Sequence, residues 1–145
     1  MNPGIQSVWV YANNIIRSAR QMVNAELKPL GLSSAEGNVL LHLLNQGEVL
    51  RQEDIVEQLE ISKPAVSKAV DHLELKGLVR RVKDDTDRRI SRVLITQRAR
   101  EISAELKNSY DKIFTLAAQG LSQEEIEEFI NIFGRVSDNF VKNRR

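Results

Sequence analysis

Apolar residues recur at two different spacings along the chain, and the spacing separates helices from strands. Between residues 5 and 28 they recur every three or four positions, which predicts a long amphipathic helix ended by Lys28-Pro29. The same spacing predicts five further helices, bounded by residues 33–47, 52–59, 62–77, 96–120 and 122–140. Residues 78–83 and 90–95 instead alternate apolar and polar positions around a polar tip, which predicts a β-hairpin. The expected fold class is mainly α with a small β-hairpin (α+β).

Small polar residues mark where several of these helices begin. Ser33 and Ser122 each precede a Glu by three positions, the pattern of a capping box. Ser62 is placed to cap the fourth helix, and Pro64 fits the first turn because its backbone nitrogen needs no helical partner there. Residues 52–96 are therefore predicted to form helix, turn, helix and hairpin, which is a winged helix-turn-helix.

The fourth helix has one apolar face and one small, polar face. Ser62, Val66, Ala69, Val70 and Leu73 share the apolar face and are expected to pack on the third helix. The opposite face and its leading end carry Lys63, Pro64, Ser67, Lys68 and Asp71. Small polar groups and Lys are what a reading helix presents to the major groove of DNA. The solvated face of an ordinary amphipathic helix has the same pattern, so the helix alone leaves both interpretations open.

The hairpin is rich in Arg, and it favours the DNA-binding interpretation. Arg81, Arg88 and Arg89 are candidate contacts, and Asp87 stands two residues before Arg89. A carboxylate at this spacing can hold a guanidinium by paired hydrogen bonds and aim it outward, into a narrow minor groove. The alternative is that the acidic residues of the tip only neutralise the Arg side chains in surface salt bridges.

The first helix and the last two helices carry long apolar stripes. The lobe between them is too small to cover these stripes, so we expect them to join two copies of the chain. The residues expected in this interface are Val8, Ile15, Ile113, Ile126, Phe129, Ile130, Phe133 and Phe140. The alternative is a bundle within one chain. The expected organisation is a single domain over residues 1–145, with a DNA-binding lobe at 30–96 and a helical dimerisation lobe at 1–29 and 97–145.

Positive charge is concentrated in the predicted fourth helix and hairpin. Residues 62–92 hold nine Lys or Arg against five Asp or Glu, whereas the rest of the chain holds twelve against fifteen. The formal net charge of +1 would by itself say nothing about nucleic acid. The modest local excess supports double-stranded DNA as the partner.

Composition excludes several classes of protein. The 145 residues contain no Cys, which removes disulfides, thiol catalysis and Cys-ligated zinc. No run approaches the roughly 18 apolar residues of a membrane helix, and the first residues lack the pattern of a signal peptide. We therefore expect no membrane association and a cytoplasmic location.

Enzyme chemistry has little support. His42 and His72 are the only histidines, and no zinc-binding pair or phosphate-binding loop is found. No metal and no cofactor are expected. A small aromatic ligand remains a prediction, in a crevice between the two lobes lined by Trp9, Tyr11, Asn14, Arg17 and His42. Core packing explains Trp9 equally well.

The span from Leu30 to Thr96 resembles the MarR family of bacterial and archaeal transcription regulators. The likeness runs through GLSSAEGNVL, ISKPAVSKAVDHLELKGLVRR and DDTDRRISRVLIT. The family's wing signature is Asp-x-Arg, five residues, an aliphatic residue and Thr, and here it is Asp87, Arg89, Ile95 and Thr96. The flanking helices match in length and pattern. Ile95 replaces the usual Leu, and Ala99 stands where Gly often follows the wing.

The resemblance implies a homodimer on a pseudo-palindromic operator, usually repressing and often released by small phenolic or other lipophilic ligands. It also implies that the fourth helix enters the major groove and that Arg89 enters the minor groove. A second function stays open, because winged helices also serve as protein–protein adaptors or as architectural proteins that coat DNA. An adaptor would not need the pair of Asp87 and Arg89.

Overall fold

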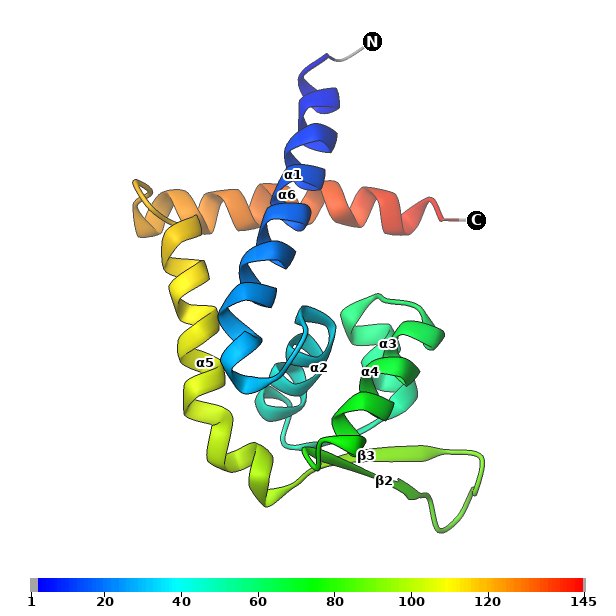
Figure 1. Ribbon diagram of the computed structural model, residues 1–145. Helices are drawn as coiled ribbons and strands as arrows, with labels where there is room; N and C mark the ends of the chain where they lie inside the picture. The colour runs from blue at the N-terminus through cyan, green and yellow to red at the C-terminus, as the bar shows by residue number, and fades with distance from the viewer. Residues whose placement is uncertain (1–2, 145) are drawn as a thin grey trace. The chain divides into compact units, whose positions relative to one another are not determined.

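The chain is mainly helical, with one small sheet (Figure 1). The computed structural model describes residues 3–144. Within that range the elements are α1 (Pro3–Leu27), the 3-10 helix η1 (Lys28–Leu30), α2 (Ser34–Asn45), β1 (Val49–Arg51), α3 (Gln52–Leu59), α4 (Lys63–Leu75), β2 (Val79–Lys83), β3 (Ser91–Ile95), α5 (Gln97–Ala117) and α6 (Gln123–Lys142). All six predicted helices and the hairpin are confirmed, and the mixed α+β class with them.

The sheet has one more strand than the sequence pattern predicts. It is antiparallel in the order β1-β3-β2, with Val49 paired to Leu94 and Val79 paired to Ile95. β1 spans only three residues, which is too short for an alternating pattern to show in the sequence. β1 pairs with the edge of β3 that β2 leaves unpaired. Because β1 ends at Arg51, immediately before α3, this pairing links the wing to the start of α3.

One hydrophobic core supports the reading unit. The chain divides into two compact units, residues 1–113 and 114–145, and every member of the core cluster lies in the first. Val23 and Leu27 of α1, together with Leu106 and Tyr110 of α5, pack with buried residues of α2, α3, α4 and the sheet. The core therefore joins the helix-turn-helix to parts of both flanking helices.

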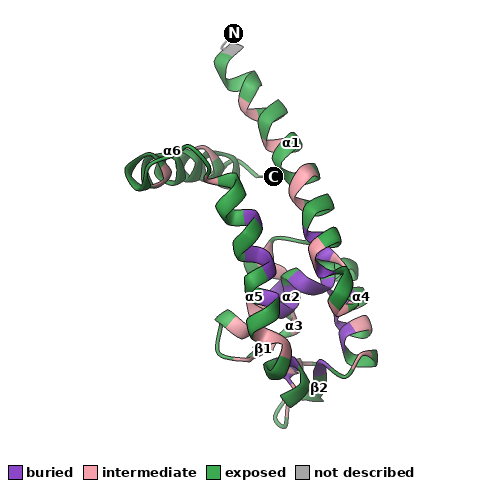
Figure 2. Cartoon of the chain, turned by 60° about the vertical axis from the view of Figure 1, so that its left-hand side comes forward, coloured by how far each residue is buried: buried purple, intermediate pink, exposed green. Residues whose placement is uncertain are grey.

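Much of α1 and nearly all of α6 are exposed (Figure 2), and the exposed residues include large apolar ones. In the first unit these include Trp9 and Ile15 of α1, and in the second they include Phe129, Phe133 and Phe140 of α6. The rings of Phe129 and Phe133 stack with their centroids 5.2 Å apart. No helix within residues 3–144 has the length and apolarity to cross a bilayer.

Ile113 is a correction to the predicted interface. It is buried at the end of the core cluster, next to Tyr110, and so has little surface left for a second chain. Its helical spacing placed it on the stripe of α5, but periodicity cannot distinguish a core contact from an interface contact.

The predicted helix starts are confirmed at Ser62 and Ser122 and only half right at Ser33. Ser62 Oγ accepts from a backbone N–H of the first turn, and Ser122 forms the complete capping box with Glu125. At Ser33 the side chain accepts from the backbone of Glu36, but the Glu36 carboxylate turns to other partners. The carboxylate that would complete the capping box instead pairs with Lys76, a residue distant in the sequence.

Candidate nucleic-acid interface

The reading helix α4 is held by its apolar face and leaves its polar face free. Val66, Val70 and Leu73 are fully buried, and the opposite face exposes Lys63 and Lys68. Pro64 and Asp71 are also exposed, whereas Ser67 is half-buried. The division predicted from helical spacing is therefore confirmed except at Ser62, which is exposed because it caps the helix. Burial of the apolar face fixes which side of α4 meets solvent.

The wing tip presents a single Arg in a defined orientation. Arg89 Nε donates to Asp87 Oδ1 at 3.1 Å, and Arg89 Nη2 donates to Asp87 Oδ2 at 3.0 Å. The backbone N–H of Arg89 also donates to Asp87 Oδ1 at 3.0 Å. Hydrogen bonds from Arg89 hold the pKa of Asp87 below its ordinary value. The side chain of Arg89 nevertheless stays 91% exposed, so the expected paired geometry is confirmed.

A second carboxylate organises the turn behind Arg89. Asp84 accepts from Thr86 Oγ1 at 2.8 Å and from the backbone N–H of Asp87 at 3.3 Å. It also pairs with Arg92 Nη2 at 3.2 Å. These bonds, led by that from Thr86, hold the pKa of Asp84 below its ordinary value. The acidic residues of the tip therefore shape the loop as well as balance its charge, and Arg88 lies exposed beside them.

A groove runs between the wing and the leading end of α4. Its volume is about 350 Å³, and its lining includes Lys63, Pro64 and Ser67 from α4 together with Arg89 from the wing. These four were predicted as DNA contacts from separate parts of the sequence, and the fold brings them to one place. The concave, cationic surface between a helix and an exposed Arg suits a duplex backbone.

Arg51 is a further cation of this groove, which the sequence pattern did not single out. It ends β1 and is the N-cap residue of α3, where its side chain makes no capping hydrogen bond. Its role depends on the pairing of β1 with β3, which only the tertiary structure shows. Glu53 also lines the groove and partly offsets the positive charge.

Arg81 departs from the expected orientation. Only 22% of its side chain is exposed, and its guanidinium is hydrogen-bonded to Gln52, to the backbone oxygen of Ser67 and to Asp71. Asp71, which was predicted as a DNA contact, is thereby paired within the chain. The other positively charged residues predicted to contact DNA are exposed to solvent: Lys63, Lys68, Arg88 and Arg89.

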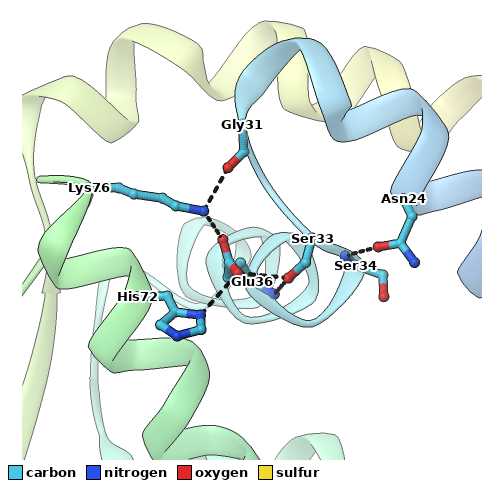
Figure 3. A network of polar contacts seen from close by, with 7 residues as sticks. All are labelled: Asn24, Gly31, Ser33, Ser34, Glu36, His72 and Lys76. Carbon is cyan, nitrogen blue, oxygen red and sulfur yellow. Dashed lines mark hydrogen bonds and ion pairs between the residues drawn. The ribbon is translucent and has the colours of Figure 1, made fainter.

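A buried carboxylate ties α4 to the segment that joins α1 and α2 (Figure 3). Glu36, only 5% exposed, pairs with Lys76 and lies 3.4 Å from Nδ1 of His72. Lys76 Nζ also donates to the backbone oxygen of Gly31 at 2.6 Å, and Ser33 Oγ donates to Glu36 at 2.8 Å. Burial alone would raise the pKa of Glu36, but these bonds and the charge of Lys76 together lower it.

The residues predicted to bind a small ligand do not enclose a site within one chain. Trp9 and Tyr11 are each 66% exposed, and Asn14 and Arg17 are exposed as well. His42 Nε2 is 2.6 Å from Gln58 Oε1, which ties His42 to α3. In residues 3–144 no group of three His, Cys, Asp or Glu is placed to hold a metal ion.

Comparison with known proteins agrees with this geometry. A model of the MarR family matches residues 30–90, which hold α4 and most of the wing. A MarR transcriptional regulator from Methanosarcina mazei Go1 superposes with a TM-score of 0.86 at 20% identity, over 96% of this chain and 99% of the other. Residues 30–90 therefore match the MarR family, and nearly the whole chain shares the fold of this regulator.

Two more solved structures share the fold of this chain. The transcriptional regulator BldR from Sulfolobus solfataricus gives a TM-score of 0.80 at 24% identity, over 94% of this chain and 96% of BldR. The organohalide-sensing regulator RdhR, in its 2,4-dichlorophenol-bound form, gives 0.81 at 19% identity, over 92% and 79% of the two chains. The shared fold therefore includes the terminal helices as well as the winged helix.

Proposed function

We propose that this MarR-family protein is a sequence-specific DNA-binding repressor. The observation that carries the proposal is Arg89, held in a plane by Asp87 yet almost fully exposed at the edge of the groove. In the proposed complex α4 enters the major groove, where Ser67 and Lys68 meet base edges. Arg89 enters the adjacent minor groove, while Lys63, Arg88 and Arg51 neutralise phosphates.

Selection of bound sequences from random duplex DNA tests this function directly. The expected product is a pseudo-palindrome with half-site centres roughly 10 base pairs apart, bound by two chains. A winged-helix adaptor would select nothing and show no salt-dependent binding, and an architectural protein would bind all sequences alike. Either result would remove the repressor proposal.

Mutants then separate the two kinds of contact. Lys68→Ala should relax the preference at particular base pairs and cost about 1–3 kcal/mol per lost base contact, and Ser67→Ala should do the same where its hydroxyl reads a base. Arg89→Ala should weaken binding at the flank and lower the salt slope by about 0.9 if it meets a phosphate, or remove an A·T preference if it lies in the minor groove. An Arg89→Ala protein with unchanged affinity and salt slope would show that the wing does not touch DNA.

We also propose that two copies of the chain pair through their terminal helices. The large apolar residues exposed on each of α1 and α6 support this, because exposed apolar surface that gathers on one element marks an interaction site. Val8, Ile15, Ile126, Phe129 and Ile130 are the residues expected to meet the second chain, together with Phe133 and Phe140. A cytoplasmic location, where duplex DNA is available, is part of the same proposal.

Release by a small aromatic ligand completes the proposed function. The family likeness includes a regulator bound to 2,4-dichlorophenol, and the aromatic rings of Trp9 and Tyr11 are free to contact such a ring in a dimer crevice. A ligand shifts the equilibrium only if it binds the two arrangements of the reading helices unequally, with an expected coupling of about 1–3 kcal/mol. Titration of salicylate and chlorophenols against the protein–operator complex tests this, and Trp9→Ala should abolish any release.

A further inference from the structure

Arg81 lies on the inner face of the wing. It pairs in register with Val93 of β3, which is fully buried, and cross-strand partners share one face of a sheet. β2 packs on α4, so Arg81 stands where a core residue would stand, at the margin between the sheet and the reading helix. Its neighbour Arg80 is exposed on the opposite face.

All three guanidinium nitrogens of Arg81 are used within the chain. Nε donates to Oε1 of Gln52, the first residue of α3, at 3.0 Å, and Nη2 donates to the backbone oxygen of Ser67 at 3.1 Å. Nη1 donates to Asp71 and lies 3.5 Å from Oε1 of Glu74. Because the donors of a guanidinium lie in one plane at fixed angles, one side chain joins β2, α3 and α4.

The main chain of the wing is tied to α4 at the same place. The backbone N–H of Arg81 donates to Oε2 of Glu74 at 3.0 Å. β2 is an edge strand of the sheet, so this bond satisfies a group that no neighbouring strand can reach. Glu74 therefore accepts from the backbone of Arg81 and pairs with its side chain.

We infer that Arg81 is a positioning residue that sets the geometry of the reading helix relative to the wing, and thereby the selectivity for DNA sequence, without touching DNA itself. The inference rests on the proposed DNA-binding function. Ser67 and Asp71 belong to the reading face, and their bonds to Arg81 fix that face before DNA arrives. Turning Arg81 toward a phosphate would break all of these bonds, whereas the exposed Lys63 and Lys68 reach solvent without such a loss.

Binding to two duplexes distinguishes positioning from contact. Arg81→Ala should weaken binding to the selected operator about tenfold or more, the equivalent of one charged hydrogen bond. Binding to an unrelated duplex of equal length should weaken less than about threefold, with an unchanged salt slope, because no phosphate contact is lost. Arg80→Ala is the matched control, since it removes the same charge from the neighbouring position and should leave the ratio of the two affinities unchanged.

Arg81→Lys keeps the charge but cannot hold three partners in a plane, so it should lose most of the selectivity as well. Asp71→Asn keeps an oxygen acceptor for the guanidinium and should retain more selectivity than Asp71→Ala. A fall of about 0.9 in the salt slope of Arg81→Ala, or equal weakening on both duplexes, would instead assign Arg81 to the phosphates. Full selectivity in Arg81→Lys would show that its charge alone matters.

Hydrogen exchange on the free protein tests the positioning role of Arg81 independently of the proposed DNA-binding function. Amides of α4 around Ser67 should exchange faster in Arg81→Ala than in Arg80→Ala, and equal exchange would contradict the positioning role. If the unaltered protein binds all duplexes alike, the proposed function fails and the selectivity role of Arg81 fails with it. Exchange in α4 would then still decide whether Arg81 holds the helix.

Discussion

The carboxylate of Asp87 shows how a single side chain decides the way a neighbouring charge is presented. It holds Arg89 in a plane through two bonds, and it also places a negative charge beside a side chain proposed to meet DNA. These two effects act in opposite directions on DNA affinity. If the orienting effect is larger, Asp87 strengthens the binding of Arg89 to DNA. If the negative charge is larger, Asp87 weakens it.

Asp87→Ala should therefore weaken binding to the operator, by less than Arg89→Ala does. The positive charge remains, but the guanidinium must be ordered on binding, and ordering a long side chain costs about 0.5–1.5 kcal/mol. Affinity for the selected operator measures the effect, with Asp85→Ala as a control that removes the same charge from the exposed tip. Stronger binding by Asp87→Ala than by the unaltered protein would mean that Asp87 only neutralises Arg89.

Gly37 is a second position where a single added atom, a Cβ, would change the stability of the fold. It lies inside α2, and a Cβ added there would approach Cδ1 of Leu27 and come within 2.8 Å of the Tyr110 hydroxyl. Ala is favoured over Gly in a helix by about 1 kcal/mol, but overpacking costs about 1–3 kcal/mol. Gly37→Ala should therefore destabilise the fold in urea unfolding.

Ala35→Gly in the same helix is the matched control for that measurement. Ala35 is exposed, so its replacement should report helix propensity alone and lower stability by about 0.5–1 kcal/mol. A Gly37→Ala protein more stable than the unaltered chain would show that α1 and α5 move apart easily at this point.

At the scale of elements, α2 connects the reading helix to both flanking helices. Glu36 pairs with Lys76, which follows the last residue of α4, and the hydroxyl of Tyr110 in α5 donates to Asn38 at 2.6 Å. The backbone N–H of Ser34 donates to the side chain of Asn24 in α1 at 2.6 Å. These bonds, with the core between the helices, give α4 a fixed position in the first unit.

The Glu36 contact predicts how stability depends on pH. The pKa of Glu36 in the folded chain is lowered from its ordinary value of 4.5, so the folded state favours the ionised form. Its contribution is present above that ordinary pKa and is lost as the pH falls through the lower, folded value. Stability of the unaltered protein should therefore fall below about pH 4.5 more steeply than that of Glu36→Gln.

Urea unfolding at pH 7 and pH 4 measures this difference. Glu36→Gln should be less stable at pH 7, because Lys76 loses its partner, and the gap should narrow toward pH 4. Glu101→Gln, on the exposed side of α5, is the control and should change neither value. A gap that stays constant with pH would mean that Glu36 acts through its shape and not through its charge.

At the scale of the whole molecule, the core and most of the proposed dimer contacts lie in different parts of the chain. Every member of the core cluster precedes residue 114, and α6 contributes no buried residue. Removing residues 120–145 should therefore leave a folded winged-helix unit that no longer pairs. Circular dichroism should report a folded chain and sedimentation a monomer, with operator affinity reduced to that of one half-site.

A point mutant provides a milder version of this test. Phe129→Glu places a charge in the exposed stripe of α6 and should dissociate the dimer without unfolding either unit. Glu128→Gln, the exposed neighbour on the same helix, should leave the dimer intact. A truncated chain that stays dimeric would confine the proposed interface to α1.

The sequence by itself determined the helices, the hairpin and the face of α4 that meets solvent. Spacing of apolar residues is a local property, and burial of Val66, Val70 and Leu73 follows from it directly. The pairing of Asp87 with Arg89 was predictable for the same reason, since two residues of separation leave the side chains few other geometries.

Only the tertiary structure decided the properties that depend on distant residues. β1 forms a strand because Val49 pairs with Leu94 of β3. Arg81 faces the interior because its hydrogen-bond partners lie there: Gln52, Ser67 and Asp71. Nothing in the local sequence distinguishes such an Arg from one that faces DNA. Glu36 leaves its capping box for the same reason, because a buried carboxylate is stabilised more by a cation from another helix than by the nearest backbone N–H.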